Sequence, residues 1–330
     1  MLHWTIEKLN LYLKHSWSIS RGSTDQKTNF YISVTEKGIT GIGEVAPNIR
    51  YNETPEKILS DFGIILNNDL PIVKDLDKLQ NLLNTFKISN SLKCGIEMAY
   101  IDFLTKKEKT SVFQMLNLKK PTQISTAFTI PIMNPDEIER FHLKFDLNKF
   151  KYLKVKINAE TGLEMLEAVN RVAEQTILVD ANEAFKKADD VLKLMEATAA
   201  FDIALYEQPL PSYLDEEYYF LKENSPYELF ADESITSELD FVKIKRQFHG
   251  VNMKLMKAGG LVNGAKIIKE AKLYGLKTMV GCMVETTVGI ANGMYFAGEV
   301  DYVDLDSFLY LENDPSSRIQ EEKGILSFKN

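Results

Sequence analysis

Lys154-Val155-Lys156 is the first of five short segments in which strand-forming apolar residues adjoin charged ones. The other four are Ile177-Leu178-Val179-Asp180, Ala204-Leu205-Tyr206-Glu207, Leu229-Phe230-Ala231-Asp232 and Val251-Asn252-Met253-Lys254. Counted from Lys156, the charged residues at the ends of these segments follow one another at steps of 24, 27, 25 and 22 residues. Each step has room for one strand, one helix and two loops, so the spacing predicts consecutive units of a β/α barrel.

Amphipathic segments separate the predicted strands. In Gly162 to Glu174, four apolar residues fall on one helical face, and Val191 to Ala200 and Gly264 to Tyr274 are also predicted to be helical. Strands that alternate with helices favour a parallel sheet with right-handed crossovers. We therefore expect a barrel over residues 121–310, followed by a tail over 311–330.

The N-terminal part has a different pattern. Trp4 to Leu13 and Thr28 to Thr35 are predicted strands, and Lys37-Gly38 is a predicted hairpin turn. From residue 54 to about 106 the apolar spacing is helical. Strands followed by helices predict a separate α+β domain over residues 1–120, against which the C-terminal tail packs back. The expected fold class is thus α/β, a TIM-like β/α barrel with an N-terminal α+β capping domain.

The composition is typical of a folded protein that acts on a small molecule. Of the 330 residues 45% are hydrophobic and 26% are charged, and the net charge of −8 argues against binding to nucleic acid or an anionic membrane. Two cysteines, Cys94 and Cys282, provide no disulfide framework and favour a cytoplasmic location. We find neither a signal-peptide pattern nor an apolar run of about 20 residues. Barrel enzymes frequently associate, and the sequence leaves the number of subunits open.

Three carboxylates and two lysines are expected at one end of the barrel, where such folds place their active sites. Asp180, Glu207 and Asp232 would repel one another without a cation, and an all-oxygen set of ligands suits Mg²⁺. Lys156 and Lys254, on either side of that metal, can act as bases if nearby positive charge and partial burial lower their pKa values. This arrangement predicts proton transfer at a carbon beside a carboxylate, through an enediolate that the metal stabilises.

Each of these residues also has an ordinary structural interpretation. An acidic residue directly after a strand is often a cap or first-turn residue of the next helix. Lys154 and Lys156 share one face of their strand, which also fits an exposed stripe. The functional interpretation is favoured because five consecutive strand ends carry charged residues in the order lysines, acid, acid, acid, lysine.

The charged segments resemble the motifs of the muconate-lactonizing branch of the enolase superfamily, and the resemblance extends over essentially the whole chain. It is carried by Lys154-Val155-Lys156, Asp180-Ala181-Asn182, Glu207-Gln208-Pro209, Asp232-Glu233-Ser234 and the run from Lys254 to Ala258-Gly259-Gly260. The resemblance implies that Asp180, Glu207 and Asp232 bind one Mg²⁺. It also implies that Lys156 and Lys254 are the acid/base residues, facing the (S) and (R) configurations respectively. Lys154 would contact the substrate carboxylate.

Within that branch, the later segments resemble those of dipeptide epimerases. Gly281-Cys282-Met283-Val284-Glu285 is similar to the segment of the seventh barrel strand, and Asp304-Leu305-Asp306 is similar to the paired aspartates of the eighth. In that family the aspartates hold the ammonium group of the N-terminal residue, and a desolvated ammonium does need a close anionic partner. Cys282 and Thr129 correspond to substrate-contacting positions. Cys282 also fits an ordinary packed cysteine, and Asp304 a cap at the barrel end.

Two loops of the capping domain are expected to set the substrate preference, Ser20 to Asp25 and Pro47 to Glu53. Arg21 resembles an arginine that faces the acidic side chain in alanyl-glutamate epimerases, and a guanidinium group suits a carboxylate. Arg50 and Glu53, in the second loop, could redirect that preference. We therefore predict an isomerase that epimerises dipeptides of the L-Ala-D/L-Glu type, with a small-molecule dipeptide as its partner.

Two other functions fit parts of the pattern. An o-succinylbenzoate synthase or a cycloisomerase of the same superfamily would use the same metal and lysines, but such substrates carry no ammonium group for Asp304 and Asp306. A barrel that only binds a metal-chelated ligand would need no acid/base groups on both faces, so the pair Lys156 and Lys254 argues against it.

Overall fold

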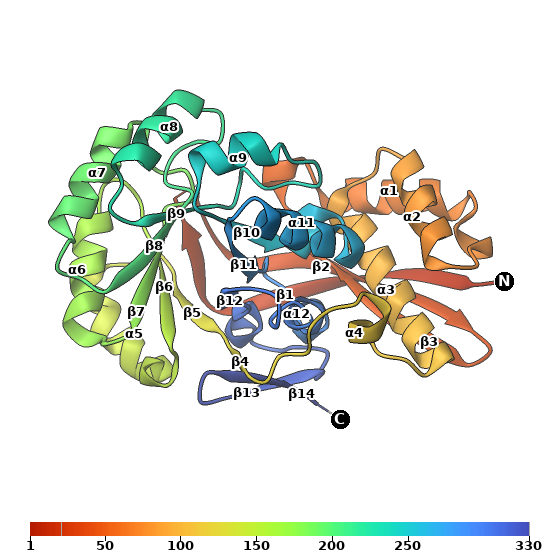
Figure 1. Ribbon diagram of the computed structural model, residues 1–330. Coiled ribbons are helices and arrows are strands. Elements are labelled where there is room, and N and C mark those ends of the chain that lie inside the picture. Colours follow the sequence, from red (N-terminus) through yellow and green to blue (C-terminus); the bar gives the residue numbers. More distant parts are fainter. Residues whose placement is uncertain (21, 330) are drawn as a thin grey trace.

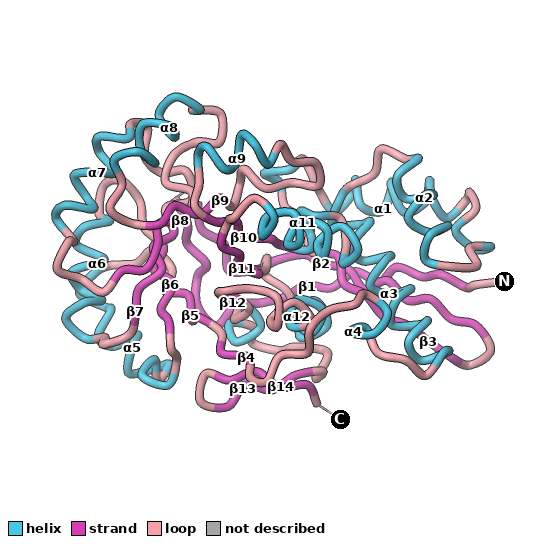
Figure 2. Tube along the Cα trace, viewed as in Figure 1, coloured by secondary structure: helices cyan, strands magenta, loops and turns pink. Residues whose placement is uncertain are grey.

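An eight-stranded parallel sheet and a separate three-stranded antiparallel sheet dominate the structure, a computed structural model that describes residues 1–20 and 22–329 (Figures 1 and 2). The parallel sheet curves into a barrel with helices outside it, and the antiparallel sheet and its helices extend to one side, toward the N-terminus in Figure 1. The predicted fold class, a β/α barrel with an N-terminal α+β capping domain, is confirmed. The boundaries near residues 120 and 310 stay a prediction.

The antiparallel sheet is longer than its sequence pattern predicted. Its strands, in the order β1-β2-β3, are β1 (His3–Ile19), β2 (Gly22–Glu36) and β3 (Ile39–Val45). β1 continues past the predicted end at Leu13, and its register against β2 shifts between Tyr12 and Trp17. The β1–β2 hairpin therefore includes most of the first predicted loop, and its end projects toward the barrel.

Helices pack on one face of this sheet. They are α1 (Pro55–Leu66), α2 (Leu76–Thr85), α3 (Asn90–Glu108) and α4 (Val112–Met115). The Thr54 hydroxyl accepts a hydrogen bond from the Lys57 amide and so caps α1. α3 lies so close to β3 that a Cβ atom on Gly43 would stand 2.1 Å from the Gly95 carbonyl oxygen. This contact accounts for the glycine-punctuated third strand.

The barrel strands follow one another in chain order. They are β5 (Ala127–Ile130), β6 (Tyr152–Lys156), β7 (Thr176–Asp180), β8 (Ile203–Glu207), β9 (Glu228–Ala231), β10 (Gly250–Lys254), β11 (Lys277–Gly281) and β12 (Tyr302–Asp304). Their register aligns the charged strand ends, with Lys156 opposite Asp180 and Asp180 opposite Glu207. The predicted five-strand pattern therefore brings its charged residues to one mouth.

Helices on the outside connect the barrel strands. They are α5 (Ile138–Phe145), α6 (Gly162–Val172), α7 (Ala188–Ala197), α8 (Asp215–Asn224), α9 (Phe241–Gln247), α10 (Leu255–Ala258), α11 (Leu261–Leu273) and α12 (Thr287–Met294). Short 3-10 helices are η1 (Ile49–Tyr51), η2 (Leu70–Ile72), η3 (Pro135–Glu137), η4 (Leu147–Lys149) and η5 (Ser307–Tyr310). Inside the barrel, buried apolar side chains such as Leu178, Phe230 and Met279 pack together, so the lower barrel is a filled core.

Side chains close the barrel between its first and last strands. The Leu305 amide donates to the Thr126 hydroxyl at 2.9 Å, and the Thr129 amide donates to Asp306. The C-terminal strands β13 (Ile319–Glu322) and β14 (Ile325–Phe328) form a small antiparallel sheet with β4 (Ile124–Ser125).

The C-terminal tail contacts the capping domain through an ion pair. The Arg318 guanidinium lies 3.1 Å from the Asp102 carboxylate of α3.

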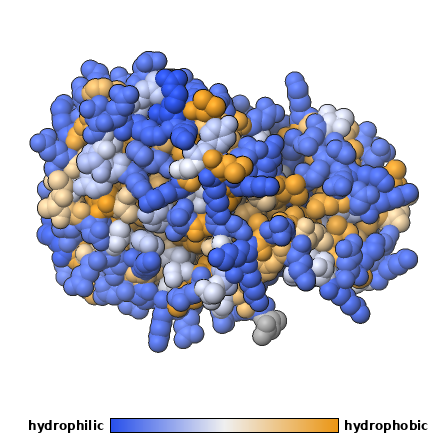
Figure 3. Space-filling model, viewed as in Figure 1, coloured by the Kyte–Doolittle hydropathy of each residue, from blue (hydrophilic) through white to orange (hydrophobic). Residues whose placement is uncertain are grey.

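The exposed surface has no single large apolar face in the view of Figure 3, where hydrophilic residues predominate over both parts of the molecule. Within the described ranges, no helix combines the length and the apolar character needed to cross a bilayer.

Candidate active site

A pocket of about 620 Å³ lies between the capping domain and the barrel mouth. The capping domain contributes the end of the β1–β2 hairpin, from Trp17 to Asn29, and residues 46–51. The barrel contributes strand-end residues, including Lys156, Asp232, Lys254 and Cys282. The pocket has the size of a small-molecule site and is lined by residues of both domains.

One wall of the pocket is formed by Lys156 at the end of β6. Its Nζ lies 2.7 Å from Asp180 Oδ2 and 3.1 Å from Asn182 Oδ1. The same ammonium lies 5.8 Å from the ring centroid of Trp17, within the range of a cation–π contact. Trp17 belongs to the capping domain, so residues from both domains hold this lysine in place.

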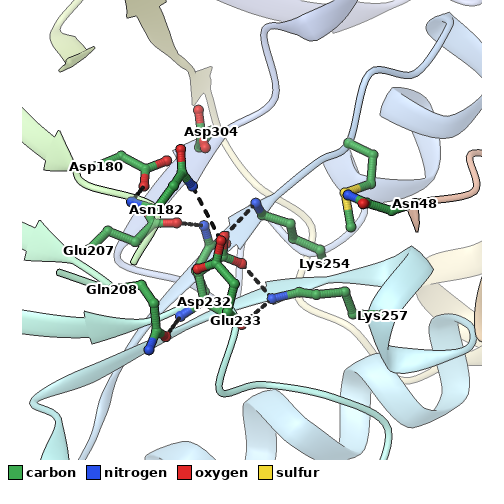
Figure 4. Close-up of polar contacts among 12 residues, drawn as sticks. Asn48, Asp180, Asn182, Glu207, Gln208, Asp232, Glu233, Lys254, Lys257 and Asp304 are labelled. Carbon is green, nitrogen blue, oxygen red and sulfur yellow. Dashed lines mark hydrogen bonds and ion pairs between the residues drawn. The ribbon is translucent and has the colours of Figure 1, made fainter. Parts of the chain in front are cut away.

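Asp232 pairs with two lysines, Lys254 and Lys257, at the barrel mouth (Figure 4). Lys254 Nζ lies 2.9 Å from Asp232 Oδ2, and Lys257 donates to Asp232 Oδ1 and to its carbonyl oxygen. Gln208 fixes the same segment, because its Oε1 accepts the Asp232 amide at 2.9 Å. All of these groups are buried.

A third buried lysine, Lys154, lies between the carboxylates of three strands. Its Nζ is 2.8 Å from Glu207 Oε2, 3.2 Å from Asp180 Oδ2 and 2.7 Å from Asp304 Oδ2. Lys154 does not line the pocket, and its predicted contact with the substrate carboxylate stays a prediction.

Charge pairing sets the protonation of these groups. Burial opposes ionisation of Asp180, but the ammonium groups of Lys156 and Lys154 outweigh it and lower the pKa of Asp180 below its ordinary value. Burial likewise opposes ionisation of Asp232, yet Lys254 and Lys257 hold its pKa well below the usual range. At Glu207, burial prevails and raises the pKa.

Lys254 responds in the opposite sense to the sequence-based expectation, and Lys154 shows the same effect. Burial would lower the pKa of Lys254, but the Asp232 carboxylate outweighs it and the pKa is raised. For Lys154, the charges of Asp304, Glu207 and Asp180 outweigh burial and also raise the pKa. In this arrangement the carboxylates therefore keep both groups as ammonium ions.

Lys156 and Lys254 stand on opposite sides of the barrel. They end β6 and β10, which are separated by β7, β8 and β9 in the sheet of eight strands. Strands four positions apart in a closed eight-stranded barrel face each other across its axis. Since both lysines also line the pocket, a molecule bound there has one ammonium group on either side.

The donor set at the mouth fits a hard divalent cation. Asp180 and Glu207 end β7 and β8, and Asp232 directly follows the neighbouring β9; all three offer only oxygen atoms, which suits Mg²⁺. As the side chains stand in residues 1–20 and 22–329, no three acidic, His or Cys side chains converge as a chelating group. Instead the Lys154 ammonium supplies positive charge between Asp180 and Glu207. The carboxylates thus need a cation, and a metal ion would compete with Lys154 for two of them.

The residues predicted for the substrate's ammonium end lie deeper than the pocket wall. Asp304 Oδ1 is buried and accepts no hydrogen bond from any described residue. Asp306 accepts from the Thr129 amide, and burial next to Asp304 raises the pKa of Asp306 to about 7. Cys282 does line the pocket and donates weakly to the Ser307 hydroxyl at 3.4 Å.

The second predicted substrate loop is fixed to the barrel and to α3. Arg50 makes a two-point contact with Glu183 beyond the end of β7, at 3.2 Å from Nε and 3.0 Å from Nη2. Glu53 is buried and accepts from the Ser91 amide near the start of α3, so its carboxylate serves the capping domain. Arg21, predicted to face an acidic substrate side chain, lies outside the described residues.

Several pocket residues were not singled out from the sequence. Trp17 and Lys27 lie between the predicted strands, outside the predicted loop at Ser20 to Asp25, and Tyr51 lies in η1 within the second predicted loop. Alternation along β2 could have found Lys27, because it lies two residues before the buried Asn29 and shares its face. Asn182 and Glu233 belonged to the quoted motifs, without a role of their own.

The barrel mouth combines three acids with two opposed lysines, and an α+β domain covers it. This combination defines a class of acid/base barrel enzymes. Residues 138–314 match the enolase C-terminal domain-like family, and residues 5–117 match the N-terminal domain of mandelate racemase/muconate lactonizing enzyme. The chain belongs to the enolase superfamily, in the group of mandelate racemase and muconate lactonizing enzyme.

Similar proteins include two named epimerases. An L-Ala-D/L-amino acid epimerase of Pedosphaera parvula is 33% identical, over 97% of this chain and 94% of the relative. A hydrophobic dipeptide epimerase of Roseobacter litoralis is 32% identical, over 97% and 95%. One similar solved structure is an enolase family member of Agrobacterium tumefaciens with homology to dipeptide epimerases, which contains sodium and L-Ala-L-Glu. It has a TM-score of 0.90 and 26% identity, and covers 100% of this chain and 98% of that chain.

Proposed function

We propose that this protein is a dipeptide epimerase, an isomerase that inverts the α-carbon of the C-terminal residue of a dipeptide such as L-Ala-L-Glu. The observation that carries this proposal is the placement of Lys156 and Lys254 across one pocket, at the ends of opposed strands. Inversion at a carbon requires that a proton leaves one face and another arrives on the opposite face. A pair of lysines on either side supplies one acid/base group to each face.

Asp180, Glu207 and Asp232 are the residues that would hold one Mg²⁺ in this proposal. The bound ion would supply positive charge that stabilises the substrate carboxylate as negative charge develops on its oxygens. Lys156 and Lys254 would exchange protons with the α-carbon, and Lys154 would add a further positive charge close to the metal ligands. The pocket, covered by the β1–β2 hairpin and η1, would limit the access of water.

Asp304 supports a dipeptide over other carboxylate substrates. Its Oδ1 atom is buried without a hydrogen-bond donor among the described residues, and buried acceptors are ordinarily satisfied. An ammonium group at the N-terminus of a dipeptide would satisfy it. Succinylbenzoate-type and muconate-type substrates carry no such group.

The decisive experiment incubates the enzyme with a dipeptide library and Mg²⁺ in D₂O and follows deuterium uptake at the α-carbon by mass spectrometry. We expect uptake in dipeptides that carry a free ammonium group, and loss of uptake in excess chelator. Turnover restricted to substrates without an ammonium group, or full turnover in metal-stripped enzyme, would reject the proposal.

A further inference from the structure

Lys27 occupies an unusual place in the wall of the pocket. It lies in β2, two residues before the buried Asn29, and both residues line the pocket. Alternate residues of a strand point to the same face, so the Lys27 side chain points toward the barrel mouth. Its side chain is half-buried.

Lys27 differs from the other cationic residues of the pocket wall in its pairing. Lys156 is paired with Asp180, Lys254 with Asp232, and Arg50 with Glu183. The side-chain ammonium of Lys27 has neither a hydrogen-bond acceptor nor an ion-pair partner among residues 1–20 and 22–329. Burial lowers the pKa of Lys27, and no neighbouring carboxylate offsets this effect.

An ammonium group in a partly desolvated wall without a counter-ion is unfavourable unless a ligand supplies the anion. We propose that Lys27 is a specificity-determining residue that binds the acidic side chain of the substrate's C-terminal residue. This inference rests on the proposed epimerase function and names the substrate class of the same site, dipeptides that end in Glu or Asp. It assigns recognition to a residue other than Arg21.

The placement of the proposed catalytic groups selects the C-terminal side chain as the partner. The reacting α-carbon lies between Lys156 and Lys254, which line the same pocket as Lys27. Asp304, proposed for the ammonium end, lies outside the pocket wall. The substituent that extends from the α-carbon toward the capping domain is therefore the C-terminal side chain. There it meets Lys27 beside the apolar groups of Trp17 and Ile19.

The test replaces Lys27 by a neutral side chain of similar length. For Lys27→Met and the unaltered enzyme, kcat/KM is measured with alanyl-glutamate and alanyl-glutamine, which differ only in charge and one polar group. We expect the preference for Glu over Gln to fall about tenfold or more, as for a lost charge-assisted hydrogen bond. Lys8→Met, at an exposed position of β1, removes the same charge and should leave the preference unaltered.

A charge reversal provides the second arm. In Lys27→Glu, the ratio of kcat/KM for alanyl-lysine to kcat/KM for alanyl-glutamate should be more than tenfold higher than in the unaltered enzyme. Thermal unfolding of each variant checks that it is folded, and Lys27→Gln replaces any variant that is not.

Three outcomes would overturn the inference. The first is an unaltered Glu over Gln preference in Lys27→Met. The second is an unaltered enzyme without that preference. The third is a larger loss of kcat/KM in Lys27→Met with glutamyl-alanine than with alanyl-glutamate as the substrate. If the enzyme exchanges the α-proton of dipeptides in these cases, the proposed function stands and only the role of Lys27 falls. If no dipeptide exchanges deuterium, both fall.

Discussion

Glu44 of the capping domain caps a helix of the barrel through Thr286. The Glu44 carboxylate accepts the Thr286 amide at 2.9 Å and the Thr286 hydroxyl at 2.7 Å, and Thr286 is the N-cap residue of α12. The same carboxylate accepts the Gly289 amide at 2.9 Å. A second glutamate, Glu97 of α3, accepts the Val262 amide in the first turn of α11. Two buried acids of the capping domain thus cap successive barrel helices.

Replacing Glu44 should weaken the interface between the capping domain and the barrel. In Glu44→Ala, the buried donors of Thr286, Gly289 and Asn29 lose their acceptor, so we expect a loss of about 3 kcal/mol in the free energy of unfolding. Urea denaturation measures it. Glu7→Ala, at an exposed position of β1, is the matched control, and equal midpoints for the two variants would contradict the prediction.

Glu97 should make stability depend on pH. Burial raises the pKa of Glu97 from 4.5 to about 7, although the Val262 amide and the Gln80 side chain partly offset it. Because the pKa is higher in the folded protein, the folded state binds more protons between these pH values. The stabilisation that protonated Glu97 contributes to the free energy of unfolding is therefore complete below pH 4.5 and is lost as the pH rises through about 7.

The variant Glu97→Gln tests this dependence. The free energy of unfolding of Glu97→Gln should decline by about 3 kcal/mol less than that of the unaltered protein between pH 4.5 and about 7, because the new side chain does not titrate. The variant should stay folded, since Gln80 can turn its amide to accept from the new side chain. Melting temperatures across the range measure the difference from the unaltered protein. Glu108→Gln, at the exposed end of α3, is the control, and parallel pH curves for Glu97→Gln and the unaltered protein would argue against the prediction.

Asp304→Asn should damage activity far more than stability. The variant keeps the shape of the side chain, and Lys154 retains its contacts with Glu207 and Asp180. The charge that would pair with the substrate ammonium is lost, so kcat/KM for dipeptides should fall about 10- to 100-fold. Kinetics and thermal melting are measured on the same preparation. A variant that melts much earlier but keeps its specific activity would identify Asp304 as a structural cap.

The two lysines should have separable roles. Lys254→Ala should abolish epimerisation, while Lys156 still exchanges the α-proton of the one diastereomer that it faces. By family resemblance we expect this to be the (S) configuration, and Lys156→Ala should show the reverse pattern. Deuterium exchange is followed separately for the L,L and L,D dipeptides, with metal binding measured in parallel. Equal exchange of both diastereomers by one variant would point to a single mobile base.

The sequence predicted the barrel because period and spacing are local properties of the chain. Lys156, Asp180, Glu207, Asp232 and Lys254 follow strand-forming runs at intervals of one β/α unit, so their common location at the mouth follows from the fold class alone. The long β1–β2 hairpin was underestimated. Its polar outer half resembles a loop, yet it extends as a strand whose end contacts the barrel, where the Ile132 amide donates to the Ser18 carbonyl oxygen at 3.1 Å.

The sequence by itself thus determined the fold class and the order of acids and lysines around the mouth, since both depend on residue type and on spacing along the chain. Only the tertiary structure decided which charges pair. In the folded protein Lys154 contacts three carboxylates, and the Thr129 amide donates to Asp306 where the barrel closes. Glu53 and Glu44 accept hydrogen bonds from amides at helix N-termini. The tertiary structure also left Lys27 without a partner in the described residues. The reason is physical: the partner of a charged group depends on which groups come within about 4 Å of it, and sequence spacing does not specify such distances between domains.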